Sequence, residues 1–265
     1  SVTGVQTCAL PICMAPHAPY TVSDRAFSRL VTIAEELDLP IHLHLHETLD
    51  EISSSLAQHG CRPLDRINAL GVLGPRLIAV HSVHLDDLEI GLLARHGASV
   101  AHCPTSNLKL ASGFAPVHRL HSAGVNIGLG TDGAASNNRL DMFADMRLAA
   151  LLGKGSSSDA TSVPAWQALE MATINGARAL ALDSRIGSIA AGKCADLAAV
   201  DLNALDISPC YDPHSHLVYA AGREHVSDVW VNGRRLVRQG ILTTLDREEL
   251  LARAHYWRDR IQDLK

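Results

Sequence analysis

Short apolar runs alternate with amphipathic segments along the chain from Met14 onward. Four runs have the length and the Val, Ile and Leu content of buried strands, at residues 40–46, 77–84, 98–104 and 125–132. Segments with helical periodicity flank them, at residues 23–37, 86–97, 116–123 and 140–152. MAPHAPY, at residues 14–20, ends an earlier unit of the same kind. Strands that alternate with helices predict βα units and a parallel sheet, hence an α/β fold.

The pattern changes in the second half of the chain. GKGSSSDA, at residues 153–160, has the composition of a linker, and a helix is expected from Ser162 and Pro164 to about Leu182. Strand-like runs follow at 187–202 and 226–237, where Asn232-Gly233 indicates a type I′ hairpin. Residues 247–264 read as a charged amphipathic helix. We therefore expect a βα domain over 14–182, a β-sandwich part over 183–245 and a terminal helix over 246–265.

The first thirteen residues, SVTGVQTCALPIC, do not share this organisation. They begin without Met, carry no basic segment and keep neither a helical nor a strand period. A signal peptide is therefore a poor interpretation, and we expect residues 1–13 to be a sequence artefact outside the fold.

Composition and charge exclude several classes of partner. Apolar residues make up 47% of the 265 residues, which is enough for a core, and the net charge is −5. Lys and Arg form no basic cluster, which argues against a nucleic-acid or anionic-membrane partner. No apolar stretch approaches the roughly 20 residues that span a bilayer. Six scattered cysteines without a C-x-x-C pair favour reduced thiols and a cytoplasmic location.

Histidine is the unusual residue of this sequence. Fifteen histidines occur, and residues 41–48 read IHLHLHET. In a strand, His42, His44 and His46 point to one face. They would form a polar stripe if that face met solvent, but parallel strands in βα folds are covered on both faces. Buried imidazoles destabilise a fold unless they bind a partner or a metal, so the stretch favours metal ligands.

Polar residues also end the strands that follow. His81, His102 and Asp132 each come at the carboxyl end of a predicted strand. In a (β/α)₈ barrel, that end carries the active site. Asp132 has a second interpretation as the N-cap of the next segment, while Gly130 and Gly133 beside it indicate a tight loop. Taken together, these positions predict a catalytic or metal site at this rim.

Four motifs carry a family resemblance. HLHET, AVHSVHL, HCPTSNLKLASG and GLGTDGAASNN resemble the amidohydrolase superfamily. They are most similar to the branch of 5-methylthioadenosine/S-adenosylhomocysteine deaminases and triazine hydrolases. The resemblance runs from about Met14 to about residue 240, and GSIAAGKCADLAAVD is similar to the start of that family's β-sandwich. It implies the C-terminal part of a TIM-like (β/α)₈ barrel, about strands 4 to 8.

The resemblance also implies roles for single residues. His44 and Asp132 would hold one divalent metal, by preference zinc, with iron or manganese as alternatives. Glu47 would be the proton shuttle, His81 would hold the attacking water, and Asp132 would accept its proton. Glu47 has a second interpretation as a first-turn acid favoured by the helix dipole.

Further positions are implied at the substrate. His17, Ser136 and Glu47 match substrate-contact positions of the family. His42 and His46 match no firm role beyond support or packing, and His84 and His102 are weaker candidates for lining the pocket.

One departure from the family is large. The family completes its metal site with an H-x-H pair on the first barrel strand, and this sequence has no such strand. A complete (β/α)₈ barrel takes about 250 residues, but the βα pattern here covers only 14–182. We therefore expect a C-terminal fragment of a longer enzyme. Its open sheet edges at strands four and eight predict self-association into homo-oligomers or poor solubility.

The expected activity is hydrolytic deamination. The resemblance implies a small-molecule substrate of the adenine nucleoside type, 5-methylthioadenosine or S-adenosylhomocysteine, with release of ammonia. Two alternatives stay open: another heterocycle such as guanine, cytosine or a chloro-triazine, and a catalytically silent truncated scaffold.

Overall fold

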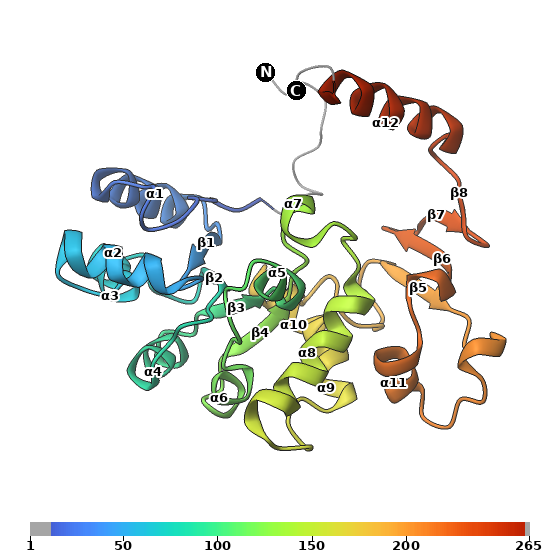
Figure 1. Ribbon diagram of the computed structural model, residues 1–265, viewed down its shortest axis with the longest axis horizontal. Coiled ribbons are helices and arrows are strands. Elements are labelled where there is room, and N and C mark those ends of the chain that lie inside the picture. The colour runs from blue at the N-terminus through green and yellow to red at the C-terminus, as the bar shows by residue number, and fades with distance from the viewer. Residues whose placement is uncertain (1–11, 263–265) are drawn as a thin grey trace.

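Two four-stranded sheets organise the chain in the computed structural model, which describes residues 12–262 (Figure 1). The first sheet is parallel, with the order β1-β2-β3-β4. Its strands are β1 (Ile41–Leu45), β2 (Leu77–His81), β3 (Ser99–His102) and β4 (Asn126–Leu129). The predicted α/β fold with a parallel sheet is therefore confirmed. Residues 1–11, most of the segment set apart in the sequence, lie outside the described part.

The segment before β1 continues the parallel arrangement for a short distance. Met14 forms a parallel bridge with Ile41, and the amides of His42 and His44 donate to the carbonyls of Met14 and His17 at 2.8 and 3.1 Å. This pairing places His17 next to the strand that carries His44. The predicted unit that ends in MAPHAPY thus borders β1, although only as an isolated bridge.

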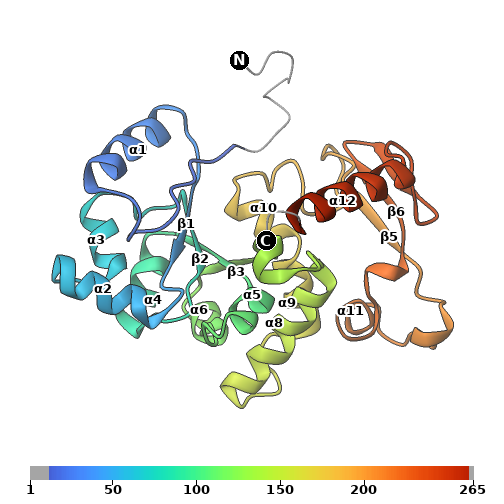
Figure 2. The same ribbon diagram turned by 45° about the horizontal axis from the view of Figure 1, so that its top comes forward.

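Helices connect the parallel strands and pack against the sheet (Figure 2). The polar caps Ser23, Thr48 and Asp86 accept hydrogen bonds at the starts of α1, α2 and α4. The helices of this half are α1 (Asp24–Glu36), α2 (Leu49–His59), α3 (Pro63–Ala69), α4 (Asp87–Arg95), α5 (Pro104–Lys109), α6 (Val117–Ser122), α7 (Ala134–Asn137), α8 (Met142–Ser157), α9 (Ala165–Met171) and α10 (Ile174–Ala179).

The apolar face of β1 fixes which way its histidines point. Ile41, Leu43 and Leu45 are fully or almost fully buried, whereas His42 and His44 alternate with them and are only partly buried. The three apolar side chains belong to the main core cluster, together with Phe27 and Leu64 from the helices. The histidine face therefore lies on the opposite side of the sheet from this core.

Two predictions about the region after β4 are wrong. The Gly/Ser-rich stretch expected to be a linker continues α8 as far as Ser157. The turn that follows packs closely on this part of the helix, where a Cβ at Gly153 would clash with Val163. The Lys154 ammonium donates to the carbonyls of Ser162 and Val163 and ties the helix to that turn. The single helix expected over 162–182 is divided at Thr173, whose ψ of −95° is not helical and whose hydroxyl bonds back to Leu169.

The second sheet is antiparallel, with the order β5-β6-β7-β8. Its strands are β5 (Leu197–Val200), β6 (Val226–Val231), β7 (Arg234–Arg238) and β8 (Ile241–Leu242). Asn232 and Gly233 have φ values of 50° and 76°, as the predicted type I′ turn requires. Between β5 and β6 lie the short helices η2 (Leu205–Ile207), α11 (Pro213–Ser215), η3 (His216–Ala220) and η4 (Arg223–His225).

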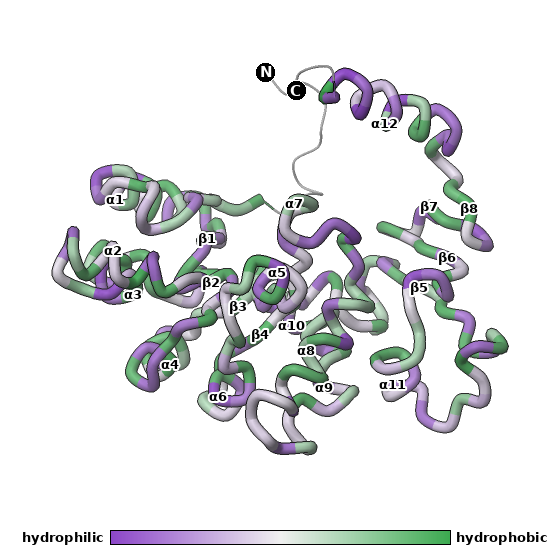
Figure 3. The backbone as a smooth tube through the Cα atoms, viewed as in Figure 1, coloured by the Kyte–Doolittle hydropathy of each residue, from purple (hydrophilic) through white to green (hydrophobic). Residues whose placement is uncertain are grey.

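The final helix is α12 (Arg247–Gln262), as the charged pattern predicted. None of its described residues is buried, and hydrophilic and hydrophobic positions alternate along it (Figure 3). Among the described residues, no helix combines the length and the apolar character needed to cross a lipid bilayer.

A close contact between two glycines holds α10 against β4. A Cβ at Gly128 would lie 3.1 Å from the Cα of Gly176 in α10. We predict that Gly128→Ala lowers the free energy of unfolding by about 1–3 kcal/mol, because this buried contact leaves no room for a methyl group.

Gly155→Ala is the matched control, since a Cβ at that exposed helical position meets no heavy atom within 4 Å. It should leave stability unchanged or raise it by up to about 1 kcal/mol. Urea unfolding of both variants measures the difference, and a Gly128→Ala chain as stable as the parent would show that the contact is not tight.

Candidate metal centre

The parallel register gathers polar side chains at the carboxyl ends of the strands. His44 is opposite Val80, and Leu45 is opposite His81, so the polar ends of β1 and β2 are adjacent. His102 ends β3, and Asp132 lies three residues beyond the end of β4. Because all four strands run in the same direction, these residues meet at one edge of the sheet.

Three of these residues converge. One ligand atom each from His44, His81 and Asp132 lies within 4.8 Å of the others. The rings of His44 and His81 are 5.3 Å apart between centroids. Two imidazole nitrogens and one carboxylate oxygen form a donor set that suits zinc, and also iron or manganese. The side chains present therefore fit a divalent metal ion.

His44 has the electronic state that a metal ligand needs. Burial, aided by His81 and His17, lowers the pKa of His44 below its ordinary value of 6.5, although Asp132 and Glu47 partly oppose the shift. The ring is therefore neutral around pH 7 and keeps a lone pair free for coordination.

Asp132 is held as a carboxylate by hydroxyl donors. Burial raises its pKa, but the hydroxyls of Ser136 and Ser106 donate to Oδ2 at 2.6 and 2.7 Å, and the Gly133 amide and His81 add to their effect. The net result is a pKa below the ordinary value of 3.8. Asp132 therefore presents a negative charge to the site at any pH near neutrality.

His81 has one ring nitrogen bonded and one facing the site. Its Nδ1 lies 2.8 Å from Oδ1 of Asn107, which can only accept, so Nδ1 carries the hydrogen. Nε2 lies 3.7 Å from the Oε2 of Glu47. In the neutral ring Nε2 therefore offers its lone pair toward Glu47 and the metal donors.

Glu47 reaches the site from the turn between β1 and α2. Its side chain is 21% exposed, and its Oε1 accepts a hydrogen bond from the Ser112 hydroxyl at 3.4 Å. It precedes Thr48, the N-cap of α2, and its carboxylate is directed at His81. The acid whose carboxylate accepts a hydrogen bond at the start of α2 is Glu51, four residues later, rather than Glu47.

Glu51 holds the backbone of Glu47 in place through a hydrogen bond. Its Oε2 accepts the Glu47 amide at 2.9 Å, and the side chain is 6% exposed. Burial raises the pKa of Glu51 from 4.5 to about 7, although the Glu47 and His46 amides oppose the shift by donating to it. Glu51 was not identified from the sequence, where it is one acid among several in a helical segment.

The two other predicted substrate residues have different environments. His17 is exposed, its Nδ1 is 3.0 Å from the Thr21 hydroxyl, and its ring centroid lies 5.0 Å from that of His44. Ser136 is buried, and its hydroxyl is bonded to Asp132. Ser136 therefore supports the carboxylate directly, a role that the sequence did not suggest.

His46 and His42 lie outside the group of three converging donors. His46 is fully buried; its Nε2 accepts the Leu64 amide at 3.1 Å and its Nδ1 is 3.3 Å from the His84 carbonyl. It therefore joins α3 to the loop after β2 and makes no contribution to the three converging donors. His42 is partly buried, and burial lowers its pKa.

Left-handed backbone conformations occur at these strand ends. His46, His81 and Asp132 have φ values of 53°, 70° and 59°. Such conformations are uncommon for residues other than glycine and cost on the order of 1–3 kcal/mol each. The surrounding hydrogen bonds therefore hold the site in a geometry that the isolated chain would avoid.

Comparison with known proteins gives consistent matches. The amidohydrolase family profile matches residues 9–236. The 5-methylthioadenosine/S-adenosylhomocysteine deaminase of Teredinibacter turnerae is 50% identical over 93% of this chain and 56% of its own length. The chain thus spans about half the length of the curated relatives it matches.

Solved structures agree with this similarity. An adenosine deaminase from Xanthomonas campestris with bound zinc superposes with a TM-score of 0.93 and 52% identity, over 95% of this chain and 57% of that one. A mutant atrazine chlorohydrolase from Arthrobacter aurescens, complexed with zinc and atraton, gives a TM-score of 0.88 at 27% identity, over 92% and 54%.

The converging donors predict a zinc affinity that depends on His44 and Asp132. We expect His44→Ala and Asp132→Ala each to weaken zinc binding by the metal-free chain by at least about tenfold, since even supporting partners of ligands are worth about 10–100-fold. His59→Ala, at an exposed position at the end of α2, is the control and should bind like the parent. Calorimetric titration measures all four proteins; equal affinities would show that zinc binds elsewhere.

The raised pKa of Glu51 predicts a stability that depends on pH. A carboxyl group with a raised pKa in the fold contributes full stability below pH 4.5 and loses it as the pH rises through about 7. Glu51→Gln stays neutral and should be about 2–3 kcal/mol more stable than the parent at pH 8, yet similar at low pH.

Urea unfolding at both pH values measures this effect. Glu36→Gln, at an exposed position ending α1, is the control and should show no such dependence. A constant difference between Glu51→Gln and the parent across the pH range would mean that Glu51 does not titrate near neutrality.

Proposed function

Because the chain belongs to the amidohydrolase family, we propose that it supplies part of the active site of a metal-dependent hydrolase that deaminates an adenine-type nucleoside. The observation that carries this proposal is the convergence of His44, His81 and Asp132 with Glu47 at its side. The likeness to a 5-methylthioadenosine/S-adenosylhomocysteine deaminase at 50% identity supports the substrate class. The chain matches about half of that relative, so the activity proposed is that of a longer enzyme.

The proposed architecture follows from the same likeness. We propose that Met14–His17 and β1 to β4 correspond to strands four to eight of a (β/α)₈ barrel within 14–182. The antiparallel strands would belong to a β-sandwich part over 183–245, followed by the terminal helix over 246–265. In such a barrel the carboxyl ends of the strands carry the chemistry, which is where the converging donors lie.

His44 and Asp132 would hold the metal ion, by preference zinc, with iron or manganese as alternatives. His81 offers a third donor atom close enough either to join them or to bind the attacking water. When bound, such an ion supplies Lewis acidity that lowers the pKa of water from about 15.7 toward 7.

The residues of the chain would then divide the proton transfers. Asp132, held as a carboxylate by two serine hydroxyls, accepts a proton from the attacking water. His81 accepts a hydrogen bond from that water through Nε2 and orients it. Glu47 delivers a proton to the ring nitrogen of the heterocycle as the carbon–oxygen bond forms. Asp132 passes its proton to the amino group, the carbon–nitrogen bond breaks, and ammonia leaves. The hydroxyl returns a proton to Glu47 and becomes the carbonyl oxygen, so both acids end in their starting states.

Substrate contacts would come from His17 together with Glu47. His17 is exposed beside His44, where a nucleoside seated over the donors would meet it. Ser136 is already bonded to Asp132, so its hydroxyl would act on the substrate only through that carboxylate. Free thiols at the five described cysteines accord with the proposed cytoplasmic location.

A chloro-triazine hydrolase is the second candidate. The likeness to an atrazine chlorohydrolase supports it, and the same acid and base groups would serve displacement of chloride. The lower identity of that match, 27% against 50%, favours the nucleoside.

Ammonia release by the polypeptide that carries this chain tests the proposal. Zinc-loaded protein should deaminate adenine nucleosides in preference to guanine, cytosine or triazines. Glu47→Gln should keep its metal but lose about 10²–10⁴-fold in kcat, because general acid–base transfer contributes that much. The exposed Glu36→Gln variant is the control and should retain full activity.

Two results would overturn the proposal. An unchanged kcat in Glu47→Gln would remove the shuttle role. No turnover of any heterocycle in the panel, with zinc bound, would favour a catalytically silent scaffold.

A further inference from the structure

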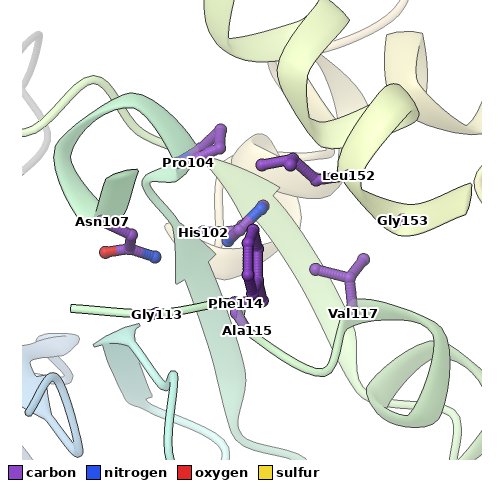
Figure 4. A pocket seen from close by; sticks show the side chains of 9 residues that line it. All are labelled: His102, Pro104, Asn107, Gly113, Phe114, Ala115, Val117, Leu152 and Gly153. Atoms are coloured by element: carbon purple, nitrogen blue, oxygen red, sulfur yellow. The ribbon is translucent and has the colours of Figure 1, made fainter. Parts of the chain in front are cut away.

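Two buried polar groups beside His81 have no partner within the part of the chain that the structure describes. His102 is 2% exposed, and neither of its ring nitrogens is hydrogen bonded. Asn107 is 1% exposed; its Oδ1 is bonded to His81, but its Nδ2 has no acceptor. In Figure 4 the amide nitrogen of Asn107 is on the side toward His102, and the oxygen points away.

Both groups line one small cavity. Its volume is about 10 Å³, which is room for about one water molecule. Its other walls are mostly apolar: Pro104, Gly113, Phe114, Ala115, Val117, Leu152 and Gly153. The polar atoms of the cavity are therefore concentrated on His102 and Asn107.

Leaving these groups unsatisfied would be costly. A buried donor or acceptor without a partner costs about 1–3 kcal/mol, and native proteins satisfy such groups with protein atoms or ordered water. Burial lowers the pKa of His102 to about 4, so its ring is neutral and has one donor and one acceptor nitrogen. A water molecule can accept from Asn107 Nδ2 and donate to the lone pair of His102.

We propose that this cavity binds one ordered water molecule between Asn107 and His102, and that this water accepts from Asn107 Nδ2 and so lets Oδ1 stay toward His81, which determines the tautomer of His81. With Oδ1 toward His81, the hydrogen of His81 must be on Nδ1, and Nε2 presents a lone pair to the site. With the amide reversed, Nδ2 would donate to Nδ1, and Nε2 would carry the hydrogen. His102 is thus a positioning residue for His81, three hydrogen bonds away through the water and Asn107.

Removal of the His102 ring should reverse the amide. Without His102 the water loses a partner, and a buried water needs about two to four. Nδ2 would then be an orphan donor, and a buried N–H is tolerated less often than an under-satisfied carbonyl. The lower-energy arrangement turns Oδ1 toward the cavity and moves the His81 hydrogen to Nε2.

Nitrogen-15 NMR of the metal-free chain tests this coupling directly. In the parent, His81 should show a protonated Nδ1 and a bare Nε2. In His102→Leu the two should exchange character, while His102→Asn, which keeps a polar group at the cavity, should restore the parent pattern. His118→Leu removes a histidine from α6 that does not line the cavity, and should leave His81 unchanged.

A high-resolution crystal structure of the parent tests the water itself. Density for one water within hydrogen-bonding distance of Asn107 and His102 is expected. A dry cavity, or a His81 tautomer that is the same in the parent and in His102→Leu, would overturn the inference. If His102→Leu does not fold, the crystal structure and His102→Asn decide the question.

The role of His81 in catalysis rests on the proposed function, but the cavity water and the His81 tautomer are measured independently of that function. The chain can fail to release ammonia and still show the water and the tautomer. It can also deaminate a nucleoside with a dry cavity, and then only the present inference would be wrong.

Discussion

The alternation of side chains along β1, locked by its parallel register with β2, is the constraint on which the site depends. Leu43 and Leu45 are buried against the helices, which forces His44 to the opposite face. A shift of one residue in this pairing would exchange the two faces and bury the histidines in the core. Apolar packing on one side of the sheet thus determines where the imidazole is presented on the other.

Hydrogen bonds then fix the positions of the His81 and Asp132 side chains, which apolar packing alone does not determine. The left-handed backbone at His81 and Asp132 is unfavourable for these residues, and hydrogen bonds with Asn107, Ser106 and Ser136 hold the side chains in place. These partners come from the segments after β3 and β4, so the site is shared between neighbouring βα units. Its precision depends on their mutual packing rather than on any single loop.

The sequence predicted the strands, their parallel order and the rim residues, because period-two patterns and strand ends are local features. Among these residues, the family resemblance singled out His44 and Asp132 as metal ligands, and the structure brings their donor atoms together. It did not predict the helical course of residues 153–157, because Gly153 is required there by close packing against Val163, which lies in a later turn. The supports Ser106 and Glu51 were missed for the same reason: a hydroxyl or carboxyl gains its role only through partners distant in the chain.

A zinc anomalous-difference map of the zinc-soaked chain tests the central claim most directly. The account predicts one strong peak within bonding distance of His44 and Asp132, about 2.0–2.2 Å from their ligand atoms, beside His81. A principal peak at any other group of side chains, with His44 and Asp132 both free of metal, would contradict it.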